Sequence, residues 1–202
     1  PPREGRRVIA YFHGNGGNIA YRADRLMRFA RDGFGVLMPE YRGYGGNPGT
    51  PSEAGLFADG HASLDFLRGE GIAGKRLVLY GESLGSAVAV EMAATVQIGA
   101  LVLESPFTSI AAVAQHHYPF VPAKLLVLDR FDALSRIGQV RAPLLVLQGG
   151  RDPVVPPHFG DALFAAAMEP KERWFAPEGG HEDLARFGAL DAVVDFIARH
   201  AR

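Results

Sequence analysis

The chain has 202 residues, of which 48% are hydrophobic, a formal net charge of −1 and a sequence pI near 6.8. This length can bury one substantial core but is short for two domains, so we expect a single domain over residues 1–202. The balanced charge gives no sign of a nucleic-acid partner or of an anionic membrane surface, and it favours a small, weakly charged substrate.

Cysteine is absent from the sequence, which excludes disulfides, a thiol nucleophile and thiolate metal sites. No segment reaches the roughly 18 apolar residues of a membrane span, and no signal-peptide pattern opens the chain. The chain as it stands therefore favours a cytoplasmic protein. It begins at Pro1 without Met, which is compatible with the removal of an N-terminal part that could have carried an anchor or an export signal.

The first two predicted units each consist of a strand, a Gly-rich loop and a helix. Residues 7–12 (RVIAYF) form an apolar run, the loop 13–18 (HGNGGN) follows, and a helical pattern extends to Arg31. Residues 35–40 (GVLMPE) repeat this plan, and their helix extends to about Arg68. Because the first loop lacks both the Gly-x-Gly-x-x-Gly spacing and a Gly-Lys-Ser/Thr ending, nucleotide binding is disfavoured.

The third unit, residues 76–96, carries Gly-x-Ser-x-Gly between a buried strand and a helix. A serine hydroxyl is a weak nucleophile unless a base takes its proton and donors meet the developing oxyanion. A sharp turn at Ser83 would expose its Oγ, and the crowding there explains Gly81 and Gly85. The N–H of Leu84, at the start of the helix, would face the oxyanion. The alternative is an ordinary Gly-rich turn, since the pattern alone is weak evidence.

The rest of the chain predicts three more strands, a lid and two more helices. The strands are expected at residues 99–104, 143–148 and 172–175, and the helices at about 158–168 and 182–199. Residues 108–138 break the alternation, so we expect a small lid there. His116 and His117 within it lack the spacing and the acidic companion of a metal site, so we expect no metal.

Six strands that alternate with helices predict a parallel sheet flanked by helices, with its functional residues at the carboxyl ends of the strands. The residues that follow strands are His13, Asn15, Tyr41, Ser83, Ser105, Asp152 and His181. A serine nucleophile needs a base and the base needs an orienting acid. We therefore expect Ser83 to be the nucleophile, His181 the general base and then acid, and Asp152 the group that orients and stabilises the imidazole.

Competing assignments remain open at two positions. Ser105 also ends a strand, but Pro106 removes the following N–H that would serve an oxyanion hole. Glu104 is an alternative acid, disfavoured against Asp152. His13 is expected to brace its loop.

The chain resembles the α/β-hydrolase superfamily over nearly all of its length. The matching stretches are HGN at 13–15, YRGYG at 41–45, GESLG at 81–85, GRDPVVP at 150–156 and GH at 180–181. Within the superfamily it looks like the bud-emergence-type branch, which is similar to the depalmitoylating hydrolases. The resemblance implies a serine hydrolase that acts on carboxylic esters or thioesters. We expect a small acyl substrate and no cofactor or metal.

The resemblance also implies an oxyanion hole made by the backbone amides of Asn15 and Leu84. Two departures follow from it: the usual N-terminal strands are expected to be absent, and the lid is short. Such an open site with an apolar floor would be lined by Phe107, Phe120 and Val121. Two alternatives stay open, namely an aminopeptidase that cleaves amides and a non-catalytic binding protein on the same fold.

Overall fold

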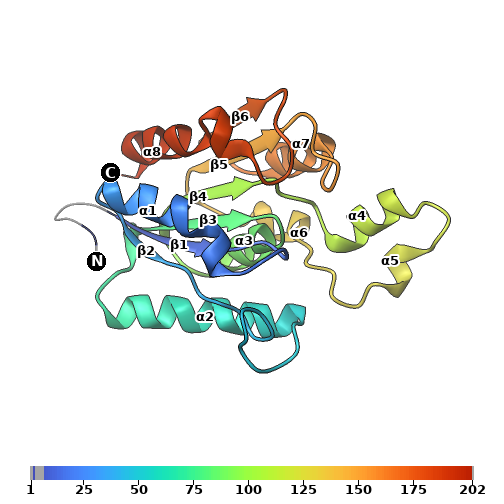
Figure 1. The fold of residues 1–202 in the computed structure, drawn as a ribbon, viewed down its shortest axis with the longest axis horizontal. Helices are drawn as coiled ribbons and strands as arrows, with labels where there is room; N and C mark the ends of the chain where they lie inside the picture. The colour runs from blue at the N-terminus through green and yellow to red at the C-terminus, as the bar shows by residue number, and fades with distance from the viewer. Residues whose placement is uncertain (1, 3–6, 202) are drawn as a thin grey trace.

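The computed structural model describes residue 2 and residues 7–201, and it is built on a six-stranded sheet in the order β2-β1-β3-β4-β5-β6 (Figure 1). The strands are β1 (Val8–Phe12), β2 (Gly35–Leu37), β3 (Gly74–Glu82), β4 (Ile98–Glu104), β5 (Leu144–Gly149) and β6 (Lys171–Ala176). Every neighbouring pair is parallel. The predicted parallel sheet of six strands is therefore confirmed.

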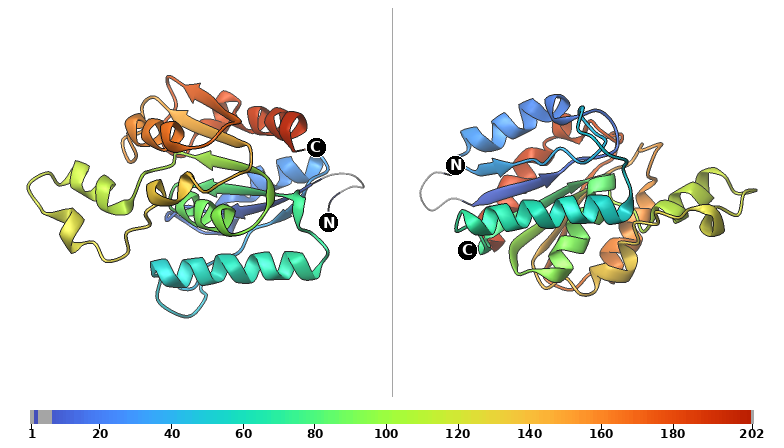
Figure 2. Two further views of the ribbon diagram at one scale, coloured as in Figure 1. Left: turned by 180° about the vertical axis from the view of Figure 1, so that it is seen from behind. Right: turned by 90° about the horizontal axis from the view of Figure 1, so that it is seen from below.

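Helices cover both faces of this sheet, as Figures 1 and 2 show. They are η1 (Ile19–Arg22), α1 (Ala23–Arg31), α2 (Glu53–Gly69), α3 (Leu84–Thr95), α4 (Ile110–His117), α5 (Ala123–Leu126), α6 (Leu134–Ile137), α7 (Pro157–Ala166), η2 (Leu184–Phe187) and α8 (Ala189–His200). Apolar side chains of α2, α3, α6 and α7 share one core cluster, and those of α1 and α8 share the other.

The alternation of side chains along the strands builds these two clusters. In β1, Val8, Ala10 and Phe12 join the cluster under α2 and α3, whereas Ile9 and Tyr11 join the cluster under α1 and α8. All five residues are buried, as expected for a parallel strand that is covered on both faces. The continuous apolar runs of the sequence therefore correspond to strands at the centre of the fold.

Two of the predicted helices are less regular than expected. The helix expected from Ile19 begins as the 3-10 turn η1, whose N-cap Asn18 accepts a hydrogen bond from the N–H of Ala20. The last predicted helix is interrupted because Gly188 adopts φ 95°, a left-handed conformation that separates η2 from α8.

Residues between β4 and β5 leave the sheet and form an arm that carries α4 and α5 (Figures 1 and 2). This is the position of the predicted lid. The arm extends away from the sheet in all three views. Among the described residues, no helix combines the length and the apolar character that a membrane crossing requires.

Candidate active site

The turn at Ser83 joins the buried strand β3 to helix α3 with almost no spare space. Ser83 has φ 50° and ψ −116°, a strained conformation for a residue with a side chain. A Cβ at Gly85 would lie 2.0 Å from the carbonyl oxygen of Phe12, and one at Gly81 would lie 2.5 Å from the carbonyl oxygen of Gly85. The glycines of the motif are thus required by close backbone approach.

Ser83, His181 and Asp152 form a continuous chain of hydrogen bonds. Nε2 of His181 lies 2.8 Å from Oγ of Ser83, and Nδ1 of His181 lies 2.7 Å from Oδ2 of Asp152. A carboxylate can only accept a hydrogen bond, so Nδ1 of His181 carries the proton and donates a hydrogen bond to Asp152. Nε2 is then free to accept the hydroxyl proton of Ser83. Three side chains that are far apart in the sequence meet in the geometry of a nucleophile, a base and an orienting acid.

The loop after β5 fixes the carboxylate of Asp152. Its Oδ1 accepts the N–H groups of Val154 at 2.9 Å and of Val155 at 2.8 Å, which leaves Oδ2 for His181. Burial by itself lowers the pKa of His181, but the hydrogen bond and negative charge of Asp152 outweigh it and raise that pKa above its ordinary value. Asp152 therefore stabilises the protonated imidazole.

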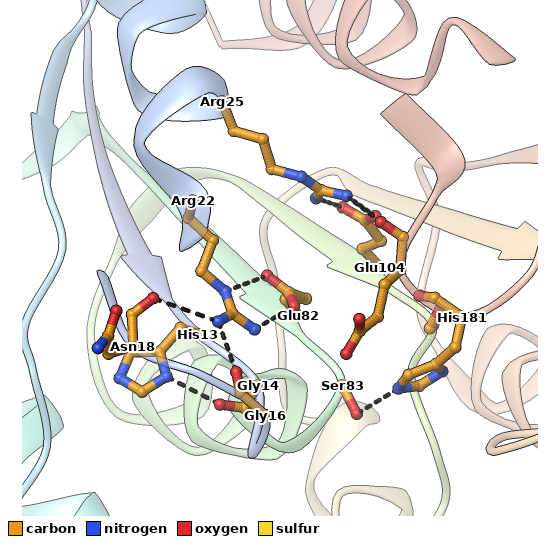
Figure 3. A network of polar contacts seen from close by, with 12 residues as sticks. His13, Gly14, Gly16, Asn18, Arg22, Arg25, Glu82, Ser83, Glu104 and His181 are labelled. Atoms are coloured by element: carbon orange, nitrogen blue, oxygen red, sulfur yellow. Dashed lines mark hydrogen bonds and ion pairs between the residues drawn. The ribbon is translucent and has the colours of Figure 1, made fainter. Parts of the chain in front are cut away.

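A buried ion pair lies directly before the Ser83 turn (Figure 3). The guanidinium of Arg22 donates to both carboxylate oxygens of Glu82, with Nε 3.0 Å from Oε2 and Nη2 2.6 Å from Oε1. The hydroxyl of Tyr11 donates to the same carboxylate at 2.6 Å. Burial raises the pKa of Glu82, but the hydrogen bond and charge of Arg22 prevail and hold it below its ordinary value, so this carboxylate is ionised.

A second ion pair lies beside the first and reaches the His181 loop. Arg25 donates to both oxygens of Glu104, from Nη1 at 2.5 Å and from Nη2 at 2.8 Å. The same Nη2 donates to the carbonyl oxygen of Glu182 at 3.2 Å. The hydroxyl of Tyr80 also donates to Glu104. The carboxylate of Glu104 therefore has Arg25 and Tyr80 as its partners, and His181 pairs with Asp152 instead.

Ser105 is placed as a support for His181. Its hydroxyl is buried and donates to the carbonyl oxygen of His181 at 3.1 Å. Its φ of 47° resembles that of Ser83, but the hydrogen bond of its Oγ is to a backbone carbonyl. Of the two strand-end serines, Ser83 alone has its Oγ within hydrogen-bonding distance of the imidazole of His181 among the described contacts.

His13 braces the loop that carries Asn15. The imidazole is fully buried, packs against Tyr41 with ring centroids 4.4 Å apart and a tilt of 39°, and donates from Nδ1 to the carbonyl oxygen of Gly14 at 2.8 Å. Burial lowers its pKa. The hydroxyl of Tyr44 donates to Oδ1 of Asn15 at 2.5 Å, which orients the Asn15 side chain. These contacts agree with a structural role for His13.

An apolar cavity of about 390 Å³ opens at Ser83. It is lined by Asn15, Tyr44, Pro51, Ser52, Leu56, Ser83, Leu84, Phe107, Ile110, Val113, Asp129, Phe131, Val154 and Val155. Of the described residues in this lining, Asp129 supplies the one carboxylate, and its Oδ1 accepts the N–H of Glu53 at 2.9 Å.

The structure brings some of the predicted lining residues to this cavity and leaves others outside. Asn15, Leu84 and Phe107 line the cavity with Ser83. Phe120 and Val121 lie on the arm instead, with 100% and 44% of their surfaces exposed, and they are not part of the lining. The irregular sequence of the insert has no periodicity that would indicate which way these side chains point.

Sequence reasoning missed the two Arg–Glu pairs. The available signals were Glu82 and Glu104, each directly before a strand-end serine, and two arginines one helical turn apart. Charged side chains are rarely fully buried unless they are paired. A buried strand that ends in Glu therefore predicts a cation close to that carboxylate.

The described residues contain no group of three or more His, Asp or Glu side chains placed to hold a metal ion. His116 and His117 contact each other, with ring centroids 5.2 Å apart. His117 also lies with Nε2 2.8 Å from the carbonyl oxygen of Val154, which connects the arm to the loop after Asp152. The adjacent histidines therefore have structural contacts.

Sequence comparison identifies relatives that cover almost the whole chain. Residues 3–132 match the Hydrolase_4 family model, which is described as serine aminopeptidase, S33. The uncharacterized protein MT2364 of Mycobacterium tuberculosis is 44% identical over 198 residues, which cover 96% of this chain and 70% of that protein. Protein bem46 of Schizosaccharomyces pombe is 33% identical over 98% of this chain and 69% of that protein.

The alpha/beta hydrolase domain-containing protein 17B of Xenopus laevis is 30% identical over 95% of this chain and 66% of its own length. With bem46, this match confirms the predicted resemblance to the bud-emergence-type branch. Among solved structures, the acetyl xylan esterase from Paenibacillus sp. R4 has a TM-score of 0.79 at 21% identity and covers 96% of this chain and 74% of its own. Esterase Pf2001 of Pyrococcus furiosus has a TM-score of 0.80 at 19% identity, over 98% of this chain and 85% of its own.

The two structural matches show the fold alone, because their sequence identities are low. The family model and the relatives go further, since they match on sequence over most of the chain. The chain therefore belongs to the α/β-hydrolase superfamily and, within it, to the family described as serine aminopeptidase, S33.

Proposed function

We propose that this protein is a serine hydrolase that cleaves carboxylic esters or thioesters through an acyl-enzyme on Ser83. One observation carries the proposal: the hydrogen-bonded chain of Ser83, His181 and Asp152 ends at an apolar cavity. A nucleophile with its base and a space for an acyl group are the elements that acyl transfer requires.

In the proposed reaction, His181 Nε2 takes the Ser83 proton while Oγ attacks the substrate carbonyl carbon. The carbonyl oxygen becomes an oxyanion and accepts hydrogen bonds from the backbone N–H groups of Asn15 and Leu84. When the tetrahedral intermediate collapses, the bond to the leaving group breaks and His181 returns its proton to the departing oxygen or sulfur. Asp152 stabilises the imidazolium in both steps.

Deacylation follows the same steps, with water as the nucleophile. His181 removes a proton from the water, whose oxygen attacks the acyl carbon, and the bond to Ser83 Oγ breaks as the serine regains its proton. The products are a carboxylic acid and free enzyme. No cofactor takes part in this balance.

The cavity supports an apolar acyl group as the recognised part of the substrate. Phe107, Ile110 and Val113 are among its lining residues, and burial of apolar surface in such a cavity favours hydrocarbon chains.

An amide-cleaving aminopeptidase is the second candidate, because the matched family carries that description. Such an enzyme needs a carboxylate for the free amine of its substrate. Asp129, the one carboxylate among the described lining residues, already accepts the N–H of Glu53. The cavity thus favours the ester or thioester over the amide.

The proposal is tested by comparing p-nitrophenyl esters of graded acyl length, acyl thioesters and amino-acid anilides as substrates. We expect esters or thioesters to be hydrolysed faster than anilides. Ser83→Ala should lower the rate by about a thousandfold or more, since removal of the nucleophile leaves only binding and oxyanion stabilisation. The control is Ser63→Ala in α2, where the hydroxyl donates to the carbonyl oxygen of Asp59. An unchanged rate in Ser83→Ala refutes the assignment.

A further inference from the structure

The tip of the arm exposes a cluster of large apolar side chains. Phe120 is 100% exposed, Leu128 is 90% exposed and Leu125 is 78% exposed. Tyr118, Val121 and Leu126 add to the same stretch. Contiguous exposed apolar surface of this kind marks an interaction site in a protein of this size. We refer to residues 118–128 as the arm tip.

The arm tip carries one charged side chain, and it is positive. Lys124 stands exposed within residues 118–128, and the oppositely charged Asp129 and Arg130 follow directly after them. The whole-chain net charge of −1 conceals this local asymmetry. An apolar tip that carries a cation and no anion is complementary to a surface that is apolar beneath a layer of negative charge.

The shape of the arm favours insertion over docking against a flat protein surface. Figures 1 and 2 show α4 and α5 extending away from the sheet, so the arm tip is a thin projection. A stable protein–protein interface takes about 20–30 residues from each partner, far more than residues 118–128 supply. A lipid surface has no such requirement, because each apolar side chain that enters it contributes separately.

The arm is also continuous with the cavity at Ser83. Ile110 and Val113 on α4 line the cavity, and α4 leads directly to the arm tip. A lipid surface held by the arm tip would therefore lie at the end of the same helix that forms one wall of the cavity.

We propose that the arm tip docks the protein on an anionic lipid surface. Phe120, Leu125 and Leu128 enter the interfacial layer, and Lys124 pairs with lipid phosphate or carboxylate groups. The docking is a binding event that needs no reaction at Ser83. Its test is therefore independent of the proposed hydrolysis.

The test is co-sedimentation of the full chain with vesicles of phosphatidylcholine alone or mixed with phosphatidylglycerol, using the Ser83→Ala variant so that no lipid is cleaved. We expect binding to the mixed vesicles to exceed binding to phosphatidylcholine alone. The triple variant Phe120→Ser/Leu125→Ser/Leu128→Ser should lower the partition coefficient by about tenfold or more. Lys124→Glu should lower it by about fivefold or more, and added salt should remove that difference.

The matched control is Phe66→Ser/Met27→Ser, which removes exposed apolar side chains outside the arm (58% and 52% exposed) and should leave binding unchanged. Circular dichroism and thermal melting establish that each variant is folded. The proposal is wrong if the unmodified arm binds neither vesicle, or if the triple variant binds as well as the parent. It is equally wrong if the triple variant instead converts a dimer to a monomer in light scattering, since the arm tip would then bind a second copy.

Discussion

Glu82 and Glu104 are register partners on the adjacent strands β3 and β4, and each lies one residue before a serine with a positive φ. Their side chains are almost fully buried, with exposed fractions of 6% and 0%. Two neighbouring buried carboxylates repel each other and lose their hydration. The structure neutralises them with Arg22 and Arg25, which lie one helical turn apart.

Arg22 also links the two loops of the candidate active site. Besides Glu82, its Nη1 donates to the carbonyl oxygen of Gly16 at 2.6 Å, in the loop that carries Asn15. One guanidinium therefore holds the strand end before Ser83 and the loop of the proposed oxyanion hole together (Figure 3).

Arg22→Ala should destabilise the protein strongly. It leaves the carboxylate of Glu82 buried without its cation, which typically costs about 3–5 kcal/mol in the free energy of unfolding. Urea denaturation measures this. Arg28→Ala is the control, because its ion pairs with Asp32 and Asp191 lie at the exposed surface and should contribute little to stability. Similar losses in the two variants would contradict the importance of the buried pair.

Gly85→Ala should prevent the close approach of α3 to β1. Its Cβ would lie 2.0 Å from the carbonyl oxygen of Phe12, a backbone atom that cannot move aside as a flexible side chain can. We expect a loss of about 3 kcal/mol or more, or failure to fold. Gly69→Ala, at the end of α2, has nothing within 4 Å of the added Cβ and should be neutral or slightly stabilising. Thermal melting of the two variants decides the point, and equal melting temperatures would refute the packing argument.

Hydrolysis should increase with pH as His181 loses its proton, since only the neutral imidazole can act as a base. The pKa of His181 is raised by Asp152 despite its burial, so the midpoint of the acid limb of kcat/KM should lie above the ordinary value of about 6.5.

In Asp152→Asn the acid limb of the kcat/KM profile should move to lower pH, and kcat should fall by as much as about ten-thousandfold. The same raised pKa adds stability at pH values below the unfolded pKa, and this contribution is lost as the pH increases through the folded pKa. An acid limb that does not move in Asp152→Asn would contradict the proposed pairing.

Val113→Trp should shorten the acyl chain that the protein accepts. Val113 lines the cavity, so the larger ring would occupy space that a long acyl group needs. We expect kcat/KM for octanoyl esters to fall by about tenfold or more while acetyl esters change little. Val121→Trp provides the control, because Val121 lies on the arm outside the cavity lining. Equal effects on both esters in Val113→Trp would place the acyl group elsewhere.

The sequence predicted the sheet and the meeting of Ser83, Asp152 and His181 because parallel strands bring their carboxyl ends to one edge. Buried strands appear as apolar runs, and the polar residues that follow them all lie at the carboxyl edge of the sheet. The positions of Phe120 and Val121 could not be predicted in this way. They lie in an insert without periodicity, where the side-chain direction is set by tertiary contacts.

The buried ion pairs could not be predicted from the sequence, for a different reason. Arg22 and Arg25 have the spacing of an ordinary solvent-facing helix surface, and only the fold shows that this face lies over Glu82 and Glu104. Gly188 similarly interrupts an amphipathic pattern that continues on both sides of it. Local patterns report which residues avoid water, but not which charged groups are brought together.

The most direct test of the central claim is mass spectrometry of the intact protein after reaction with a fluorophosphonate, followed by peptide mapping. A serine made nucleophilic by His181 should take up one phosphonyl group per chain, on the peptide that contains Ser83, and hydrolysis of p-nitrophenyl esters should stop in proportion. If the protein hydrolyses these esters while Ser83 stays unmodified, or if the group is found on another residue, the proposed nucleophile is wrong.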